Sequence, residues 1–197
     1  MKYEDREIHL PEGIFNNELL FYEEKDKKVL KKYLDDWVKH CKDTINLIGG
    51  TRTPNLSEAF SEAVFSIEMG MPRCVKSISG SSSSFDLYDL KRKKRIQLKA
   101  ASSFGPSSFG PRSEYDEVYF LFFREIAEGK KYLFYSGKYE IYKLNPDDFP
   151  SLIMNKKKNE TFEDQQKQGK RPRFSIPKTL IDPHSVKPVR TGNVDLW

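Results

Sequence analysis

Cysteine and histidine are scarce in this chain of 197 residues. Cys41 and Cys74 lie far apart and show no CxxC or Cys/His spacing, which excludes a zinc knuckle and a disulfide framework. We therefore expect two free thiols in a reducing compartment. The three histidines, His9, His40 and His184, show neither metal-ligand nor triad spacing.

Long apolar runs are also lacking. No stretch approaches the roughly eighteen apolar residues of a membrane span, and residues 1–13 hold no apolar segment that could serve as a signal peptide. The sequence therefore predicts a soluble, cytoplasmic protein.

Apolar and basic residues, by contrast, are abundant. Hydrophobic residues make up 37% of the chain and aromatics 13%, which excludes a disordered chain although 32% is charged. The net charge of +5 suits a polyanionic partner only where the positive residues cluster. The length predicts one domain, 1–197, with a helical N-terminal region (1–50), a core (55–145) and a basic segment (155–190).

Helices are predicted before the core. Residues 14–41 carry strong helix formers with apolar residues at roughly helical spacing, which predicts one or two helices. A loop rich in Gly, Thr and Pro follows at 45–55, and Asn55 is placed to cap the next element. That element, LSEAFSEAVFSIEMG at 56–70, is the clearest amphipathic helix, and Gly70 ends it.

A mostly antiparallel sheet is predicted next. Apolar residues alternate in SFDLYDL and in RIQLKAAS, which predicts a β-hairpin with KRKK at its turn. Strands at 116–123, 130–137 and 139–144 extend the sheet. The fold class is therefore α/β (α+β), a mixed β-sheet flanked by helices. After residue 155 we expect one polar helix, and then a loosely structured tail over 178–197.

The predicted hairpin carries residues suited to phosphodiester hydrolysis. This reaction needs a divalent metal to steady the attacking water and the charged phosphorus centre, and a cation to polarise the phosphate. Asp86 opens the first strand, while Gln97 and Lys99 share one face of the second and Leu98 turns into the core. Asp86, Gln97 and the backbone carbonyl of Leu98 are candidate magnesium ligands. Spacing alone favours a solvated hairpin over a catalytic site, because this pattern occurs by chance in many sequences.

The amphipathic helix adds two acids, Glu58 and Glu62, one turn apart. Glu62 lies closer to the edge of the apolar stripe and is the preferred fourth member of the site. An exposed helix carboxylate is the alternative for each of the two. Asp89 lies three residues after Asp86 and should face the other side of its strand.

Basic residues cluster in two places. KRKKR at 91–95 is most often a solvated turn. The stretch 165–181 gathers lysines and arginines without an acid, so it could contact phosphates and guanine edges or serve as a basic linker. Between strands, SSFGP occurs twice in tandem over 102–111 and forms a turn-rich loop. We expect its Phe104 and Phe109 to pack on the body of the protein rather than to stack on bases.

Four segments, in this order, resemble a known family: SEAFSEAVFSIEMG, GSSSSFDLYDL, IQLKAASSFGPSSFGPRSEYDEVYFLFF and EDQQKQGKRPRFSIPK. They look like the small Type II restriction endonucleases that read the interrupted palindrome GCNGC, and the resemblance spans about residues 12–190. That family belongs to the PD-(D/E)XK nucleases. The resemblance therefore implies an α/β core, dependence on Mg²⁺, and action as a homodimer on double-stranded DNA.

The resemblance also implies roles for single residues. Asp86 would be the central metal ligand, Gln97 the second ligand and Lys99 the catalytic lysine, with Glu62 in support. The superfamily usually has an acid at the position of Gln97. Because an amide oxygen binds magnesium more weakly than a carboxylate, Gln97 could act through a water on the metal, with Glu62 supplying the missing charge.

DNA contacts are expected from the SSFGP loop and the basic segment, where losing a bidentate guanine contact costs about 1 to 3 kcal/mol. The expected DNA-contacting residues are Ser102, Ser103, Ser107, Ser108, Arg112, Lys170, Arg171 and Arg173. Two other functions stay open, a structure-selective repair nuclease of the same superfamily and a non-catalytic DNA-binding module, which Gln97 would suit. A restriction enzyme further implies a cognate DNA methyltransferase as a genetic partner.

Overall fold

The structure, a computed structural model, describes residues 1–49, 55–76, 78, 85–102, 104–111, 114–123 and 137–197. Its strands are β1 (Lys2–Leu10), β2 (Gly13–Phe21), β3 (Arg73–Cys74), β4 (Leu87–Asp89), β5 (Lys94–Ala101), β6 (Ser107–Ser108), β7 (Glu117–Phe122), β8 (Lys138–Leu144), β9 (Ile153–Asn155), β10 (Glu160–Thr161), β11 (Arg173–Phe174) and β12 (Arg190–Asn193). Its α-helices are α1 (Lys27–Asn46), α2 (Glu58–Met69) and α3 (Phe162–Lys167). Single helical turns form at Glu24–Asp26, Pro146–Asp148, Pro177–Ile181 and Val194–Leu196.

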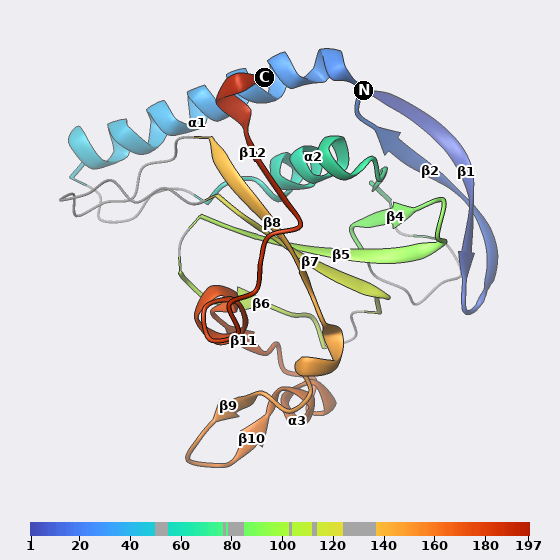
Figure 1. Ribbon diagram of the computed structural model, residues 1–197, viewed down its shortest axis with the longest axis vertical. Coiled ribbons are helices and arrows are strands. Elements are labelled where there is room, and N and C mark those ends of the chain that lie inside the picture. Colours follow the sequence, from blue (N-terminus) through green and yellow to red (C-terminus); the bar gives the residue numbers. More distant parts are fainter. Residues whose placement is uncertain (50–54, 77, 79–84, 103, 112–113, 124–136) are drawn as a thin grey trace.

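A mixed eight-stranded sheet organises the molecule, with the order β1-β2-β3-β4-β5-β7-β8-β12. Strands β5 and β7 run parallel, and the other neighbouring pairs are antiparallel. Helices α1 and α2 lie over one face, and β6, β11 and α3 lie on the other side (Figure 1). The predicted class, a mixed sheet flanked by helices, is confirmed.

The sheet separates two hydrophobic clusters. Tyr119 and Leu121 of β7 point into the cluster that α1 and α2 cover. Val118 and Phe120 point into the opposite cluster, which the chain after β8 covers. This alternation follows from the strand period of two, and the continuous apolar run of β7 reflects burial on both faces.

The prediction of helix from residue 14 is wrong. The nine residues of β2 pair along their whole length with β1 in an antiparallel hairpin, and α1 begins only at Lys27. Gly13 has a φ of 148°, a conformation that glycine adopts without strain at this turn. Cross-strand pairing and burial of Ile8 and Leu19 thus outweigh the helical spacing of the apolar residues.

Helix α2 confirms the amphipathic prediction. Phe60, Val64 and Phe65 are buried on its inner face, and Gly70 ends it in the left-handed conformation with a φ of 65°. Asn55 is not its cap as predicted, because the N-cap position falls to Ser57.

The predicted hairpin is also confirmed. Strands β4 and β5 pair antiparallel, with Leu87 opposite Ile96 and the turn within the KRKK stretch. The strand predicted at 139–144 corresponds to β8, whereas the one predicted at 130–137 lies almost wholly outside the described residues.

The prediction of a loose C-terminal tail is wrong. Strand β12 pairs with β8 and forms an edge of the sheet, and Val194 after it is fully buried. The polar helix predicted after residue 155 is the short α3, preceded by the β9–β10 hairpin. Thr161 and Asp164 form a capping box at its start. Of the described helices, none has the length and apolar character needed to cross a bilayer.

Candidate active site

A cleft of about 520 Å³ opens between the C-terminal half of β5, the first turns of α2 and the strands β6 and β11. From the predicted catalytic set it is lined by Asp86, Leu98, Lys99 and Glu62. From the predicted DNA-contacting set it is lined by Ser102, Ser107, Ser108, Arg171 and Arg173. The fold therefore brings members of the two predicted sets to one place.

Asp86 is held rigidly just before β4. Its backbone N–H donates to the carbonyl of Ile96 at 3.0 Å, and its carboxylate accepts a 2.7 Å bond from the backbone N–H of Leu98. Burial raises the pKa of this carboxyl, which the N–H of Leu98 and the ammonium of Lys99 oppose. A half-buried carboxylate with fixed geometry in the lining of a cleft is suited to binding a cation.

Gln97 and Lys99 share one face of β5, as predicted, but only Lys99 lines the cleft. Gln97 is buried and does not line the cleft, and its side-chain N–H donates to the carboxylate of Asp86. Lys99 lines the cleft, with its ammonium 5.4 Å from the ring centre of Phe109. Burial lowers the pKa of Lys99, and the neighbouring Asp86 and Glu58 act against that shift.

The acids of α2 occupy the facing wall. Burial raises the pKa of Glu62 to about 7, although the guanidinium of Arg73 opposes this shift. Arg73 Nε donates directly to the Glu62 carboxylate. Glu58 is exposed at the cleft and, within the described ranges, forms no ion pair with a described residue.

Arg73 was missed by sequence reasoning. It lies on β3, and its side chain is 21% exposed against 14% for that of Glu62. The only available signal is its position as the one charge in the otherwise apolar or neutral stretch MGMPRCV. Nothing local to that stretch identifies Glu62 as its partner.

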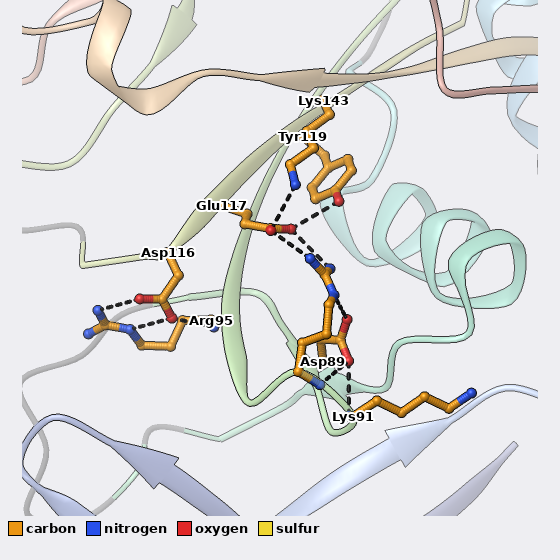
Figure 2. Close-up of polar contacts among 8 residues, drawn as sticks. Asp89, Lys91, Arg95, Asp116, Glu117, Tyr119 and Lys143 are labelled. Carbon is orange, nitrogen blue, oxygen red and sulfur yellow. Dashed lines mark hydrogen bonds and ion pairs between the residues drawn. The ribbon is translucent and has the colours of Figure 1, made fainter.

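The two arginines of the KRKKR turn form ion pairs that anchor it to the sheet. Arg92 pairs with Asp89 at 2.6 Å and with Glu117 at 2.6 Å, and Arg95 pairs with Asp116 at 3.1 Å (Figure 2). Asp89 therefore bonds within this turn and does not line the cleft. Both arginines have a structural role here, which supports the structural interpretation of this basic run.

The SSFGP loop and the basic segment form a single wall. Strands β6 and β11 pair, with Ser108 opposite Arg173, and a further backbone bond joins Phe109 N to Pro172 O at 3.0 Å. Behind them Phe109 is fully buried and stacks on Phe174, with ring centres 5.4 Å apart. The prediction that Phe109 packs on the body is confirmed, and Phe104 likewise contacts Phe122.

Other predicted DNA-contacting residues fall away from the cleft or outside the described chain. Lys170 is not part of the cleft lining and pairs with Glu160 at 2.8 Å. Ser103 and Arg112 lie outside the described residues. Among the residues that the structure describes, no cluster of three or more His, Cys, Asp or Glu side chains could hold a metal ion.

Comparison with known proteins decides the family. The family model described as Bsp6I restriction endonuclease matches residues 21–183. The chain belongs to the Bsp6I restriction endonuclease family. The Type II restriction enzyme Bsp6I of Bacillus sp. (strain RFL6) is 31% identical over 137 residues, which cover 68% of this chain and 70% of that enzyme. No solved structure matches the chain.

Membership of the Bsp6I family makes this protein a Type II restriction endonuclease, a hydrolase that cuts DNA at specific sites. The family match begins at the last residue of β2, so it leaves out nearly all of the N-terminal hairpin. It includes the cleft from α2 to β11.

Cys41 and Cys74, which the sequence predicts to be free thiols, are free in the structure.

Proposed function

We propose that this endonuclease is of the PD-(D/E)XK type and hydrolyses double-stranded DNA with Mg²⁺ at the palindrome GCNGC. The observation that carries the proposal is the cleft itself, where Asp86 and Lys99 face the acids of α2 beside two arginines of the opposite wall. Acids for a cation, a lysine for phosphate charge and arginines for DNA are the components that the reaction needs. The GCNGC site rests on the family resemblance.

The donor atoms at the cleft fit magnesium. Asp86 offers carboxylate oxygens, Leu98 a backbone carbonyl and Glu62 a second carboxylate, and Mg²⁺ prefers oxygen ligands. Asp86 and Glu58 both raise the pKa of Glu62, and such mutual repulsion is relieved by a cation between acids. When bound, the metal would supply Lewis-acid stabilisation of phosphate charge and lower the pKa of water.

Gln97 takes the position of the usual second acid. Its side-chain N–H donates to Asp86, so it fixes the direction of that carboxylate, and in this buried position Gln97 would act on the metal through Asp86. The amide adds no charge, and Glu62 supplies the second negative charge instead. Arg73 holds Glu62 in place, which favours Glu62 over the exposed Glu58 as the ligand from α2.

Lys99 stabilises the charge that develops on the phosphate. Its ammonium is held against the Phe109 ring, on a strand whose backbone position is fixed by pairing with β7. The attacking water would hydrolyse the phosphodiester directly, without a covalent enzyme intermediate. Catalysis of this kind depends on pre-positioned charge, which a central strand of the sheet provides.

Recognition of DNA is assigned to the wall formed by β6 and β11. Arg171 and Arg173 line the cleft, and Ser107 and Ser108 present hydroxyls beside them. Arginine pairs bidentately with guanine edges in the major groove, which suits a site composed of G and C. A palindromic site further suggests a homodimer in which each subunit cuts one strand.

The test is digestion of plasmid DNA that lacks methylation, with and without Mg²⁺, followed by sequencing of the fragment ends. We expect discrete, magnesium-dependent fragments that share GCNGC. Asp86→Ala and Lys99→Ala should abolish cleavage, whereas Asp89→Asn, outside the cleft, should keep it. Cleavage by the first two variants would overturn the proposed site.

The contrary outcome of this test is a DNA-binding module without cleavage, the alternative that Gln97 would suit. That function predicts DNA binding that weakens with salt and no product with any divalent metal. Cuts at branched or damaged DNA without a shared sequence would instead indicate a structure-selective repair nuclease. A DNA methyltransferase gene beside that of the chain would agree with restriction, because a host must protect its own sites.

A further inference from the structure

A second basic feature lies at the tip of the β9–β10 hairpin, outside the cleft. Lys156, Lys157, Lys158 and Asn159 form an exposed turn, here named the lysine turn. The side chain of Asn155 accepts bonds from the backbone N–H groups of Lys157 at 3.1 Å and Lys158 at 3.4 Å. Asn159 closes the turn with a φ of 49°, which asparagine tolerates. Three adjacent ammonium groups are thus presented on a preformed turn.

The charge of the lysine turn is not neutralised by nearby acids. In the described part of the chain none of its three lysines forms an ion pair. The next two acids along the sequence are already engaged, since Glu160 pairs with Lys170 at 2.8 Å and Glu163 with Lys167 at 2.8 Å. The turn is therefore a free positive patch at the end of a projecting arm (Figure 1).

The base of the arm is fixed to the body. Phe162, directly after β10, is buried in the cluster beneath the sheet, and its backbone N–H donates to the carbonyl of Leu152 at 2.8 Å. Gln166 of α3 donates to the carbonyl of Gly110, next to β6, at 2.9 Å. The arm is thereby linked to the wall that carries the cleft arginines, and its position relative to the cleft is set by packing.

We propose that the lysine turn contacts the phosphate backbone of duplex DNA outside the segment that the cleft holds. In Figure 1 the arm projects on the same side of the molecule as β6 and β11, whose Arg173 lines the cleft. No described residue of β9 or β10 lines the cleft, so the turn meets a different part of the duplex. Dense phosphate charge is complementary to the three free lysines. The proposal rests on the proposed function, because the partner is the duplex that the cleft binds.

The test compares two charge-matched variants of the full chain, with binding measured by fluorescence anisotropy in the absence of divalent metal. One variant carries Lys156→Gln, Lys157→Gln and Lys158→Gln. The control carries Lys25→Gln, Lys28→Gln and Lys32→Gln, exposed positions in the helical turn before α1 and in the first turns of α1, which Figure 1 places at the opposite end of the molecule. Each protein is titrated with duplexes of about one and about four helical turns, both centred on GCNGC.

The lysine-turn variant should bind the long duplex about ten-fold more weakly than the unaltered protein at low salt, with a salt slope shallower by about 2 to 3. Its affinity for the short duplex should not change, and the control should match the unaltered protein on the long duplex. Equal affinities of both variants for the long duplex, or an equal loss on the short one, would overturn the proposal. Binding without divalent metal is independent of cleavage, so failure of the nuclease assignment is distinguishable from failure of the arm.

Discussion

Arg73 donates from its Nε to the carboxylate of Glu62, so a cation of β3 engages a half-buried acid that lines the cleft together with Asp86. Burial raises the pKa of Glu62, and Arg73 opposes this by favouring the ionised carboxylate. Arg73 thus favours the negative charge that Glu62 would add beside Asp86, a charge that the amide of Gln97 lacks. In the proposed site Arg73 would act through Glu62, as a positioning residue.

Replacing Arg73 tests this role. Arg73→Met should leave Glu62 protonated over a wider pH range and raise the Mg²⁺ concentration for half-maximal cleavage about ten-fold or more. Arg73→Lys should restore much of the magnesium response, because it keeps the charge. A magnesium titration of cleavage, with thermal unfolding as a check on folding, measures both. An unchanged magnesium requirement in a folded Arg73→Met protein would show that Glu62 is not a ligand.

The two acids of α2 can be ranked directly. Glu62→Gln should reduce the cleavage rate about a hundred-fold, because it removes the second negatively charged ligand of the proposed metal site. Glu58→Gln, one turn away, should cost less than about ten-fold, because this side chain is exposed. Single-turnover cleavage at saturating Mg²⁺ compares them. The reverse order would assign the ligand role to Glu58.

Gln97→Glu places a second carboxylate against Asp86 in a buried position. Without metal the variant should be less stable by about 1 to 3 kcal/mol, since the donated hydrogen bond becomes a contact between two acids. Mg²⁺ should raise its midpoint of thermal unfolding more than that of the unaltered protein, because an added carboxylate strengthens an oxygen-ligand site. Equal magnesium shifts would place Gln97 away from the metal.

Glu117 gives a pH-dependent stability prediction. Burial acts to raise its pKa, but bonds from Arg92, Lys143 and Tyr119 prevail and lower it to about 2 from 4.5 (Figure 2). Because the folded pKa lies below the unfolded value, this stabilisation is complete above pH 4.5 and is lost as the pH falls toward 2. Glu117→Gln should therefore cost about 1 to 3 kcal/mol near pH 7 and much less near pH 3. Urea unfolding at the two pH values measures the difference, and a pH-independent loss would contradict it.

The parts of the fold that sequence predicts well are those with local signals. Helix α2 has its apolar stripe and its terminal Gly70, and the β4–β5 hairpin has alternation on both sides of a basic turn. Strand β2 has helix-forming residues, and only its pairing with β1 makes it a strand. Strand β12 joins β8 across a long sequence separation, which composition does not reveal.

The candidate site also contains residues that the sequence predicts and residues that it does not. Asp86, Gln97 and Lys99 follow from spacing along one hairpin, and the structure brings them together with Glu62. Arg73 and the Glu160 partner of Lys170 depend on contacts between separate elements, so the sequence did not identify them. Their roles become visible only when tertiary neighbours are known.

The wall that carries Arg173 and Ser108 is made of two short strands from distant parts of the chain, joined by main-chain bonds and by the stacked rings of Phe109 and Phe174. In the described parts of the chain, each of these two strands pairs only with the other. An engineer who wishes to retarget this enzyme should therefore transplant both segments from one donor as a unit. Exchanging one segment alone would leave its new side chains on a partner strand and ring stack that evolved for the old ones, and would disturb the alignment that the proposed base contacts need.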